Sequence, residues 1–240
     1  RLVASNLDPR RTFLKLCDKG TLPEDFTEAI KDFRIQGSSI KVNCALSELP
    51  NWKAIPGQDP NAPHQQAMFE IAPSVEYLER AYDDLKYGRP SVRPMIDGNV
   101  ASTMDDTLCP KGHHVLSMFV QYGPYKLKEG TWDQVREKVG DQIVDTLAEY
   151  APNIKKAIIA REVISPWDLE QIFGLTEGNI FHGEMTPDQL FFLRPAMRWA
   201  QYRTPLRGLY LCGSGAHPGG GVLGAPGKNA AREILRDVRR

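Results

Sequence analysis

The most regular pattern of hydrophobic and polar positions spans residues 40–47. Ile40, Val42, Cys44 and Leu46 alternate there with polar or small residues, which is the period of a β-strand with one buried face. Four other segments also favour strands, at 66–71, 91–96, 114–122 and 157–164. The pattern therefore predicts a sheet in the middle of the chain.

Helical periodicity separates these segments. From Thr131, apolar residues recur at every fourth position until Pro152, and Thr131 with Gln134 forms a T-x-x-Q capping box. Ser165 followed by Pro166 predicts a second helix start. Further helices are predicted at 23–33 and 75–87, with a short one capped by Asp8. The fold class is therefore α/β of the mixed α+β kind, with helices on a mixed β-sheet domain.

Both ends of the chain carry short apolar runs. Leu2–Ala4 and Leu209–Leu211 read as strands, and residues 225–235 have helical spacing. The connection between the last strand and helix is dense in glycine, which lets backbone approach a ligand closely. A helix start adds free N–H groups and the positive end of the helix dipole. Residues 212–224 are therefore a candidate ligand-binding loop.

Three other interpretations of this loop compete. A nucleophile elbow is excluded because Cys212 stands where G-x-S-x-G needs its first glycine. Gly219, Gly221 and Gly224 fit G-x-G-x-x-G. A true dinucleotide fingerprint, however, follows its strand directly and is followed by a second strand with an acidic residue. Here several residues separate the strand at 209–211 from these glycines, so the match is weak. A plain helix start remains open, although the segment is unusually rich in glycine for that.

Composition narrows the function classes. The chain has 240 residues, 41% of them hydrophobic, enough for one large or two small domains. Basic and acidic residues both number 30, so no net charge favours nucleic acid or an anionic membrane. No apolar run approaches the roughly 18 residues of a membrane span. The four cysteines lie far apart without a C-x-x-C pair, which favours free thiols over a redox dithiol or a zinc site.

Several motifs together resemble one family. "VASNLDP", "GNIFHGEMTPDQLFFLRP" and "LYLCGSGAHPGGGVLGAPGKNAA" are similar to segments of the phytoene desaturase-like, FAD-dependent oxidoreductases, and the resemblance covers essentially the whole chain. It implies that residues 1–8 are a strand of a Rossmann-like FAD domain, 9–205 a substrate-type mixed-sheet domain, and 206–240 the last strand and helix of the FAD domain. The ADP-binding unit is then expected upstream, and a mitochondrial location is implied in the same way.

The resemblance also implies a cofactor site. The Gly213–Gly215 turn would lie along the ribityl chain of FAD, and N–H groups of Gly221–Gly224 would face the N1 and C2-carbonyl edge of the flavin. Ser214 stands where related flavoproteins often place a carboxylate, and a neutral hydroxyl makes the weaker hydrogen bond. The expected cofactor-binding residues are Gly213, Ser214, Gly215, His217, Gly219, Gly220, Gly221, Val222 and Gly224.

Other polar residues have two interpretations each. His217 either contacts flavin or substrate or shapes a turn. His182 and Glu184 form a proton-transfer pair if their segment is extended, or lie in a solvated loop. A basic and aromatic cluster suits either an acidic cofactor group or a domain seam: Arg194, Arg198, Trp199, Tyr202 and Arg203. His113 and His114 would point to opposite faces of a strand, so no metal site is expected.

Two functions follow from this pattern. The first is hydride transfer between an unknown small organic substrate and FAD in the complete protein, with the 240 residues alone expected not to retain FAD. The second is a non-catalytic interaction or regulatory module that binds a protein partner, which Ser214 and the lack of a compelling general base favour.

Overall fold

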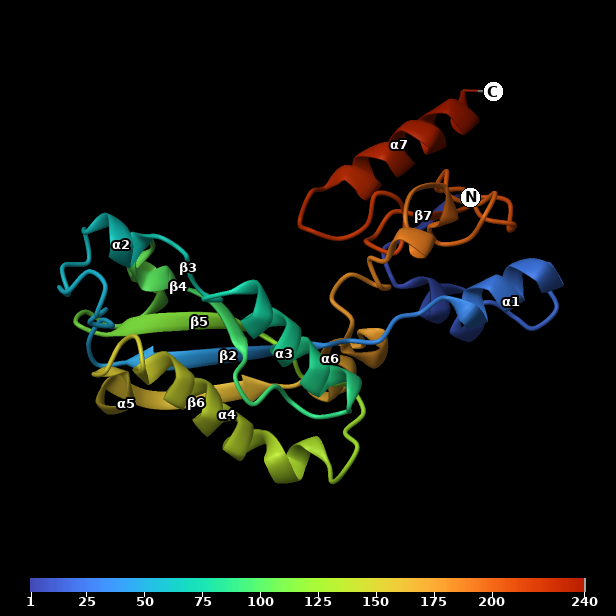
Figure 1. The fold of residues 1–240 in the computed structure, drawn as a ribbon. Coiled ribbons are helices and arrows are strands. Elements are labelled where there is room, and N and C mark those ends of the chain that lie inside the picture. Colours follow the sequence, from blue (N-terminus) through green and yellow to red (C-terminus); the bar gives the residue numbers. More distant parts are fainter. Residues whose placement is uncertain (240) are drawn as a thin grey trace. The chain divides into compact units, whose positions relative to one another are not determined.

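The structure, a computed structural model, describes residues 1–239 and divides into two compact units (Figure 1). The split unit comprises Arg1–Gly37 and the chain from Glu170 onward, and the sheet unit comprises Ser38–Leu169. The chain therefore leaves the first unit, builds the second, and returns. The predicted boundaries at 1–8, 9–205 and 206–240 separate parts of an FAD domain from a substrate-type domain, and this division remains a prediction.

The sheet unit is built on five antiparallel strands in the order β3-β4-β5-β2-β6. The strands are β2 (Ser39–Leu46), β3 (Phe69–Ile71), β4 (Met95–Val100), β5 (His114–Gln121) and β6 (Ile158–Ile164). The predicted strand at 91–96 is placed too early, because Pro94 cannot donate to a ladder and Asp84 accepts the N–H of Val92 at 3.0 Å. The predicted strand at 66–71 begins only at Phe69, after α2 (Pro63–Gln66).

Helices α3 (Val75–Lys86), α4 (Trp132–Ala148) and α5 (Ile154–Ala157) complete the sheet unit. The alternating apolar residues of β2 pack with Val139, Ile143 and Leu147 of α4 in one core. The capping box of α4 is present, and the backbone N–H of Thr131 donates to Gln134 Oε1 at 3.0 Å. The α4 pattern thus predicts both its start and its buried face.

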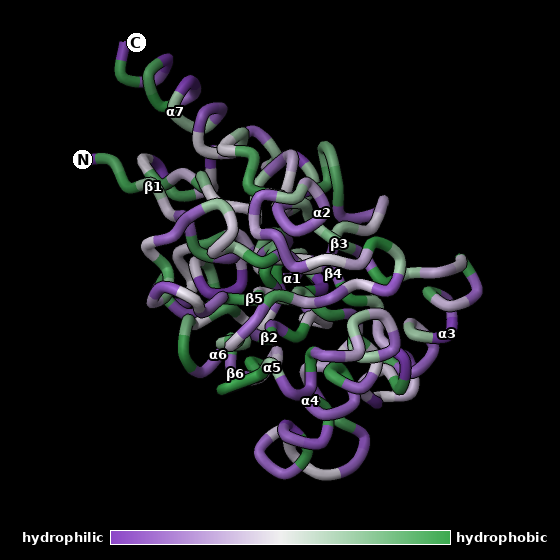
Figure 2. Tube along the Cα trace, turned by 90° about the vertical axis from the view of Figure 1, so that its left-hand side faces the viewer, coloured by the Kyte–Doolittle hydropathy of each residue, from purple (hydrophilic) through white to green (hydrophobic). Residues whose placement is uncertain are grey.

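The split unit brings the two ends of the chain together. β1 (Val3–Ser5) pairs in parallel with β7 (Leu209–Leu211), and α7 (Ala225–Val238) follows. Figure 2 shows hydrophobic and hydrophilic residues alternating along α7. A one-turn π-helix (Arg11–Lys15), α1 (Glu24–Asp32) and α6 (Pro166–Phe173) are the remaining helices longer than one 3₁₀ turn. The predicted α/β class with a mixed arrangement is confirmed.

Residues 1–239 contain no membrane-spanning helix, no cluster of metal ligands and no disulfide. No helix in this range combines the length and apolar character needed to cross a bilayer. Nor do three His, Cys, Asp or Glu side chains converge there as metal ligands. The four cysteines are all free thiols.

Candidate cofactor-binding site

The glycine loop starts where the two parallel strands end. Cys212 N–H donates to the Ser5 carbonyl at 2.8 Å, so the chain leaving β7 runs beside the chain leaving β1. A Cβ on Gly213 would lie 2.3 Å from the Asn6 carbonyl oxygen, and one on Gly215 would lie 2.4 Å from Pro9 Cδ. Glycine at 213 and 215 is therefore required for this close approach of two backbone segments, whatever else the turn binds.

The next part of the loop presents free backbone donors. Ala216 N–H donates to Gly213 and Gly219 N–H donates to Ala216, which forms two consecutive turns. From Gly220 to Gly224, no N–H donates to an acceptor within the described chain. Gly224 precedes the 14-residue α7 without any side-chain cap. A run of uncommitted donors thus lies at the positive end of a helix.

The loop backbone is left-handed at several positions. The three residues that fit G-x-G-x-x-G have φ of 110°, 117° and 63° at Gly219, Gly221 and Gly224, which explains the need for glycine there. Val222 has φ of 56° and its side chain is fully exposed. A β-branched residue in this region is strained, and such strain is typical of ligand-binding segments.

A second segment, Asn179–Met185, packs against the loop. A Cβ on Gly220 would lie 2.2 Å from Phe181 Cδ1, and one on Gly219 would lie 2.6 Å from Met185 Cε. These glycines therefore accommodate two large apolar side chains. Sequence reasoning missed this contact, although the two segments carry the same family resemblance.

Arg194 joins the two segments. Its side chain is completely buried and donates only to backbone carbonyls, at 2.8 Å to Phe181, 2.9 Å to Ser214 and 3.0 Å to Glu184, with longer bonds to Gly183 and Gln189. Burial lowers the pKa of this guanidinium to about 10. Arg194 is therefore an internal structural residue that fixes the Ser214 carbonyl, whereas the sequence left it either to an acidic cofactor group or to a domain seam.

The rest of the predicted basic cluster disperses. Arg203 binds Asp237 at 2.8 Å and Glu233 at 2.6 Å, so its charge is already paired within the split unit. Arg198 is exposed. The cluster is thus not a single anion-binding surface.

The two candidate imidazoles lie in different settings. Glu184 binds Arg34 at 3.0 Å, and His182 has φ of 57°, so the segment is not extended as the proton-transfer pair required. The Nδ1 atoms of His182 and His217 are both buried without a partner in the described chain. Burial lowers the pKa of His182; Asp8 opposes this shift and Arg194 adds to it. The His217 ring lies 6.3 Å from that of Phe191.

These features fit a cofactor with several hydrogen-bond acceptors, such as FAD. The loop offers consecutive free N–H donors and strained backbone, and the buried Nδ1 atoms of His182 and His217 have no partner in the described chain. Burial raises the pKa of Cys44 to about 11 and also raises that of Cys212, so neither thiol ionises readily.

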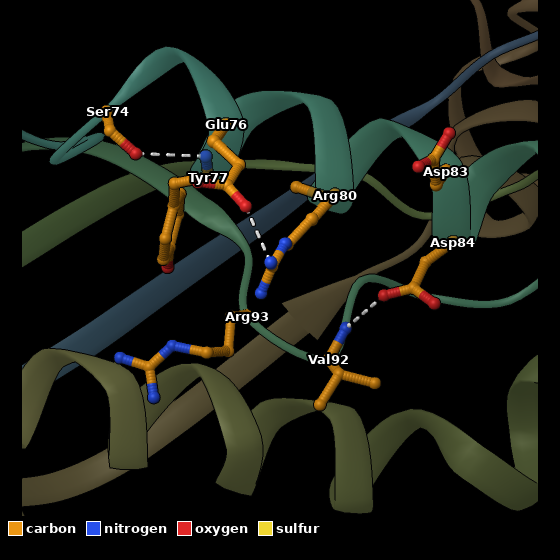
Figure 3. Close-up of a pocket in the computed structure, with 9 residues that line it drawn as sticks. Ser74, Glu76, Tyr77, Arg80, Asp83, Asp84, Val92 and Arg93 are labelled. Atoms are coloured by element: carbon orange, nitrogen blue, oxygen red, sulfur yellow. Dashed lines mark hydrogen bonds and ion pairs between the residues drawn. The ribbon is translucent and has the colours of Figure 1, made fainter.

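Another hollow, of about 540 Å³, runs along α3 in the sheet unit (Figure 3). Its charged groups are already bonded. Arg80 binds Glu76 at 2.6 Å, and Arg93 binds Glu149 at 2.6 Å. This hollow therefore offers a cofactor no uncommitted donor set like that of the glycine loop.

Comparison with solved structures gives a protein of similar fold. The chain superposes on an oxidoreductase from Methanosarcina mazei with a TM-score of 0.50 and 16% identity, over 98% of this chain and 42% of that one. The chain thus shares its fold with part of that protein. No family model matches it.

Sequence comparison then gives the particular relatives. All of the chain is 45% identical to the C-terminal part of pyridine nucleotide-disulfide oxidoreductase domain-containing protein 2 from Rattus norvegicus. Over 56% of its length it is 29% identical to phytoene desaturase (lycopene-forming) from Pseudescherichia vulneris, 27% of which is covered. The chain spans 42% of the length of the rat protein. The resemblance drawn from the sequence motifs is confirmed.

Proposed function

We propose that this chain is the part of an FAD-dependent oxidoreductase that completes the flavin site. The observation that carries the proposal is the run of free N–H donors from Gly220 to Gly224 in front of the uncapped helix α7. The similarity of the whole of this chain to part of pyridine nucleotide-disulfide oxidoreductase domain-containing protein 2 supports it. FAD, when bound, supplies the hydride acceptor or donor for an organic substrate that is not identified.

In this proposal the chain binds and orients. N–H groups of Gly221–Gly224 would hold the N1 and C2-carbonyl edge of the flavin, and the Gly213–Gly215 backbone would hold the ribityl chain with Ser214 as a hydroxyl partner. The positive end of α7 stabilises negative charge at that edge. Arg194 acts as a positioning residue, because it holds the Ser214 carbonyl in place.

The first test is an absorbance spectrum of the complete protein that contains this chain, before and after addition of dithionite. We expect a flavin spectrum that bleaches. A colourless protein that takes up no added FAD would contradict the proposal. For the 240 residues alone we expect no stoichiometric FAD, because the loop offers little contact area without an ADP-binding unit.

A substitution sharpens this test. Ser214→Asp places a carboxylate where related flavoproteins often have one, and a charged acceptor binds a hydroxyl more strongly than a neutral one by about 1 kcal/mol. We expect the Kd for FAD of the complete protein to fall about fivefold. Gln66→Glu, at an exposed position in the sheet unit, adds the same charge and serves as the control, with an unchanged Kd expected.

The alternative function is a non-catalytic module that binds a protein partner. Ser214 in place of a carboxylate favours it, as does the lack of a His182–Glu184 pair. Under this alternative the intact, gently purified protein lacks flavin absorbance. A mitochondrial location is part of either proposal and is checked by fractionation of cells that express the complete protein.

A further inference from the structure

One face of the sheet unit carries a row of polar side chains across four strands. Residues of β2 alternate between the core that packs on α4 and the opposite face, which bears Lys41, Asn43 and Ala45. The strand register places Asn43 opposite Ser117 on one side and opposite Glu162 on the other. Ser117 is thus flanked by carboxamide side chains, because Asn99 of β4 lies opposite it as well.

Lys41 reaches into this row. Its Nζ donates a hydrogen bond to Ser117 Oγ, which lies diagonally across the β2–β5 pair. Lys31, Lys86 and Lys155 each bind a carboxylate, whereas Lys41 makes no ion pair among residues 1–239. Burial lowers the pKa of Lys41, opposed by the charge of Asp97. The Lys41 amine is therefore neutral, and nucleophilic, more often than an exposed one.

A hollow of about 290 Å³ lies beside this pair. Its floor consists of the small residues Ala45 and Ala160, which are register partners, together with Val115 opposite Ala45. Asn43 and Glu162 of the polar row line its rim. The hollow is one row away from Ser117, or about 7 Å along the strand. An apolar ligand body in the hollow would thus direct its polar end toward Lys41 and Ser117.

We propose that Lys41 and Ser117 form a site that captures an aliphatic aldehyde as a reversible imine. The neutral Nζ attacks the carbonyl carbon, and the Ser117 hydroxyl passes the two protons of the nitrogen, one after the other, to the carbonyl oxygen. That oxygen then leaves as water while the C=N bond forms, so one aldehyde and one amine give one imine and one water without oxidation or reduction. The alkyl chain lies over Ala45, Val115 and Ala160. This activity does not depend on the proposed flavin site.

The test uses the whole 240-residue chain with hexanal and sodium cyanoborohydride, which fixes an imine as a secondary amine. Peptide mapping by mass spectrometry then gives the labelling rate at each lysine. We expect Lys41 to be labelled at least about fivefold faster than Lys155, which serves as the internal control because Asp145 binds it at 2.6 Å. Equal rates at the two lysines would overturn the proposal.

Two variants separate the roles of the pair and the hollow. Ser117→Ala removes one hydrogen-bonding group and is expected to slow Lys41 labelling about fivefold. Ala160→Leu fills the hollow from an exposed position on an edge strand. We expect it to slow hexanal labelling about tenfold while acetaldehyde labelling is unchanged, because only the longer chain uses the hollow. The site would be refuted if Ala160→Leu changed the hexanal and acetaldehyde labelling rates by the same factor. It would also be refuted if Ser117→Ala left the Lys41 labelling rate unaltered. Circular dichroism confirms that each variant is folded.

Discussion

Replacing Arg194 by methionine tests whether this buried side chain holds the glycine loop in place. The substitution keeps an apolar body of similar length and removes the guanidinium. The carbonyls of Phe181, Gly183 and Ser214 then lose the donor that they have in the structure. At about 1–3 kcal/mol for each buried unsatisfied group, the loss is about 3–9 kcal/mol in the free energy of unfolding.

An opposing contribution comes from the charge itself. The pKa of Arg194 is lowered by burial to about 10, which corresponds to roughly 3 kcal/mol of unfavourable desolvation that methionine does not incur. The carbonyl contribution is the larger of the two, and we expect Arg194→Met to destabilise the split unit by about 3 kcal/mol. Arg194→Lys, which keeps the charge but has a single nitrogen, should lie between this variant and the unsubstituted chain.

Hydrogen–deuterium exchange with mass spectrometry resolves this effect by segment. Amides of 181–194 and 214–220 should exchange faster in Arg194→Met, while β2 and β5 of the sheet unit keep their protection. Arg198→Met is the matched control, since Arg198 is exposed, and it should change the free energy of unfolding by less than about 0.5 kcal/mol. If Arg194→Met exchanges like Arg198→Met, Arg194 is not the internal structural residue described above.

Three further substitutions test other parts of the structure, each by urea unfolding. Gly213→Ala should lower the free energy of unfolding by about 3 kcal/mol, because the new Cβ would lie 2.3 Å from the Asn6 carbonyl oxygen. Gly224 has open space around it and φ of 63°, so Gly224→Ala should lower it by only about 1 kcal/mol. Equal losses would contradict the close approach of the two strand ends. Thr131→Ala removes the N-cap of α4 and should lower the free energy of unfolding by about 1 kcal/mol, with Gln66→Ala as an exposed control outside this helix. Burial lowers the pKa of His182 below its ordinary value of 6.5, so the unfolded chain takes up a proton before the folded one does, and the free energy of unfolding falls as the pH drops below that value. His182→Gln should therefore show a shallower decline in stability between about pH 7 and pH 5. An unchanged slope would refute this.

Local patterns predicted the elements whose conformation depends mainly on residues close together in the sequence. The alternation in β2 and the fourfold spacing and capping box of α4 require only near neighbours, and both elements appear where they were expected. β4 was displaced because the pattern of apolar residues did not weigh the prolines before it or the bond from Val92 to Asp84.

The candidate site was predictable only in part. The glycine loop is evident from composition alone, because so many glycines precede a helix. The position of Arg194 is not, since its partners are backbone carbonyls that come together only in the folded split unit. In the same way, the pairing of Glu184 with Arg34 joins residues 150 positions apart, which no local pattern indicates.

The path of the chain through the sheet unit has a consequence for protein engineering and for evolution. This unit begins at Ser38 and ends at Leu169, and near these ends Lys41 of β2 is the register partner of Ile164 of β6. A segment whose two ends lie on adjacent strands can be removed, lengthened or exchanged for another without redirecting the rest of the polypeptide. The sheet unit can therefore be exchanged by replacement of one continuous stretch of gene, while the two distant stretches that encode the β1–β7 pair are left untouched.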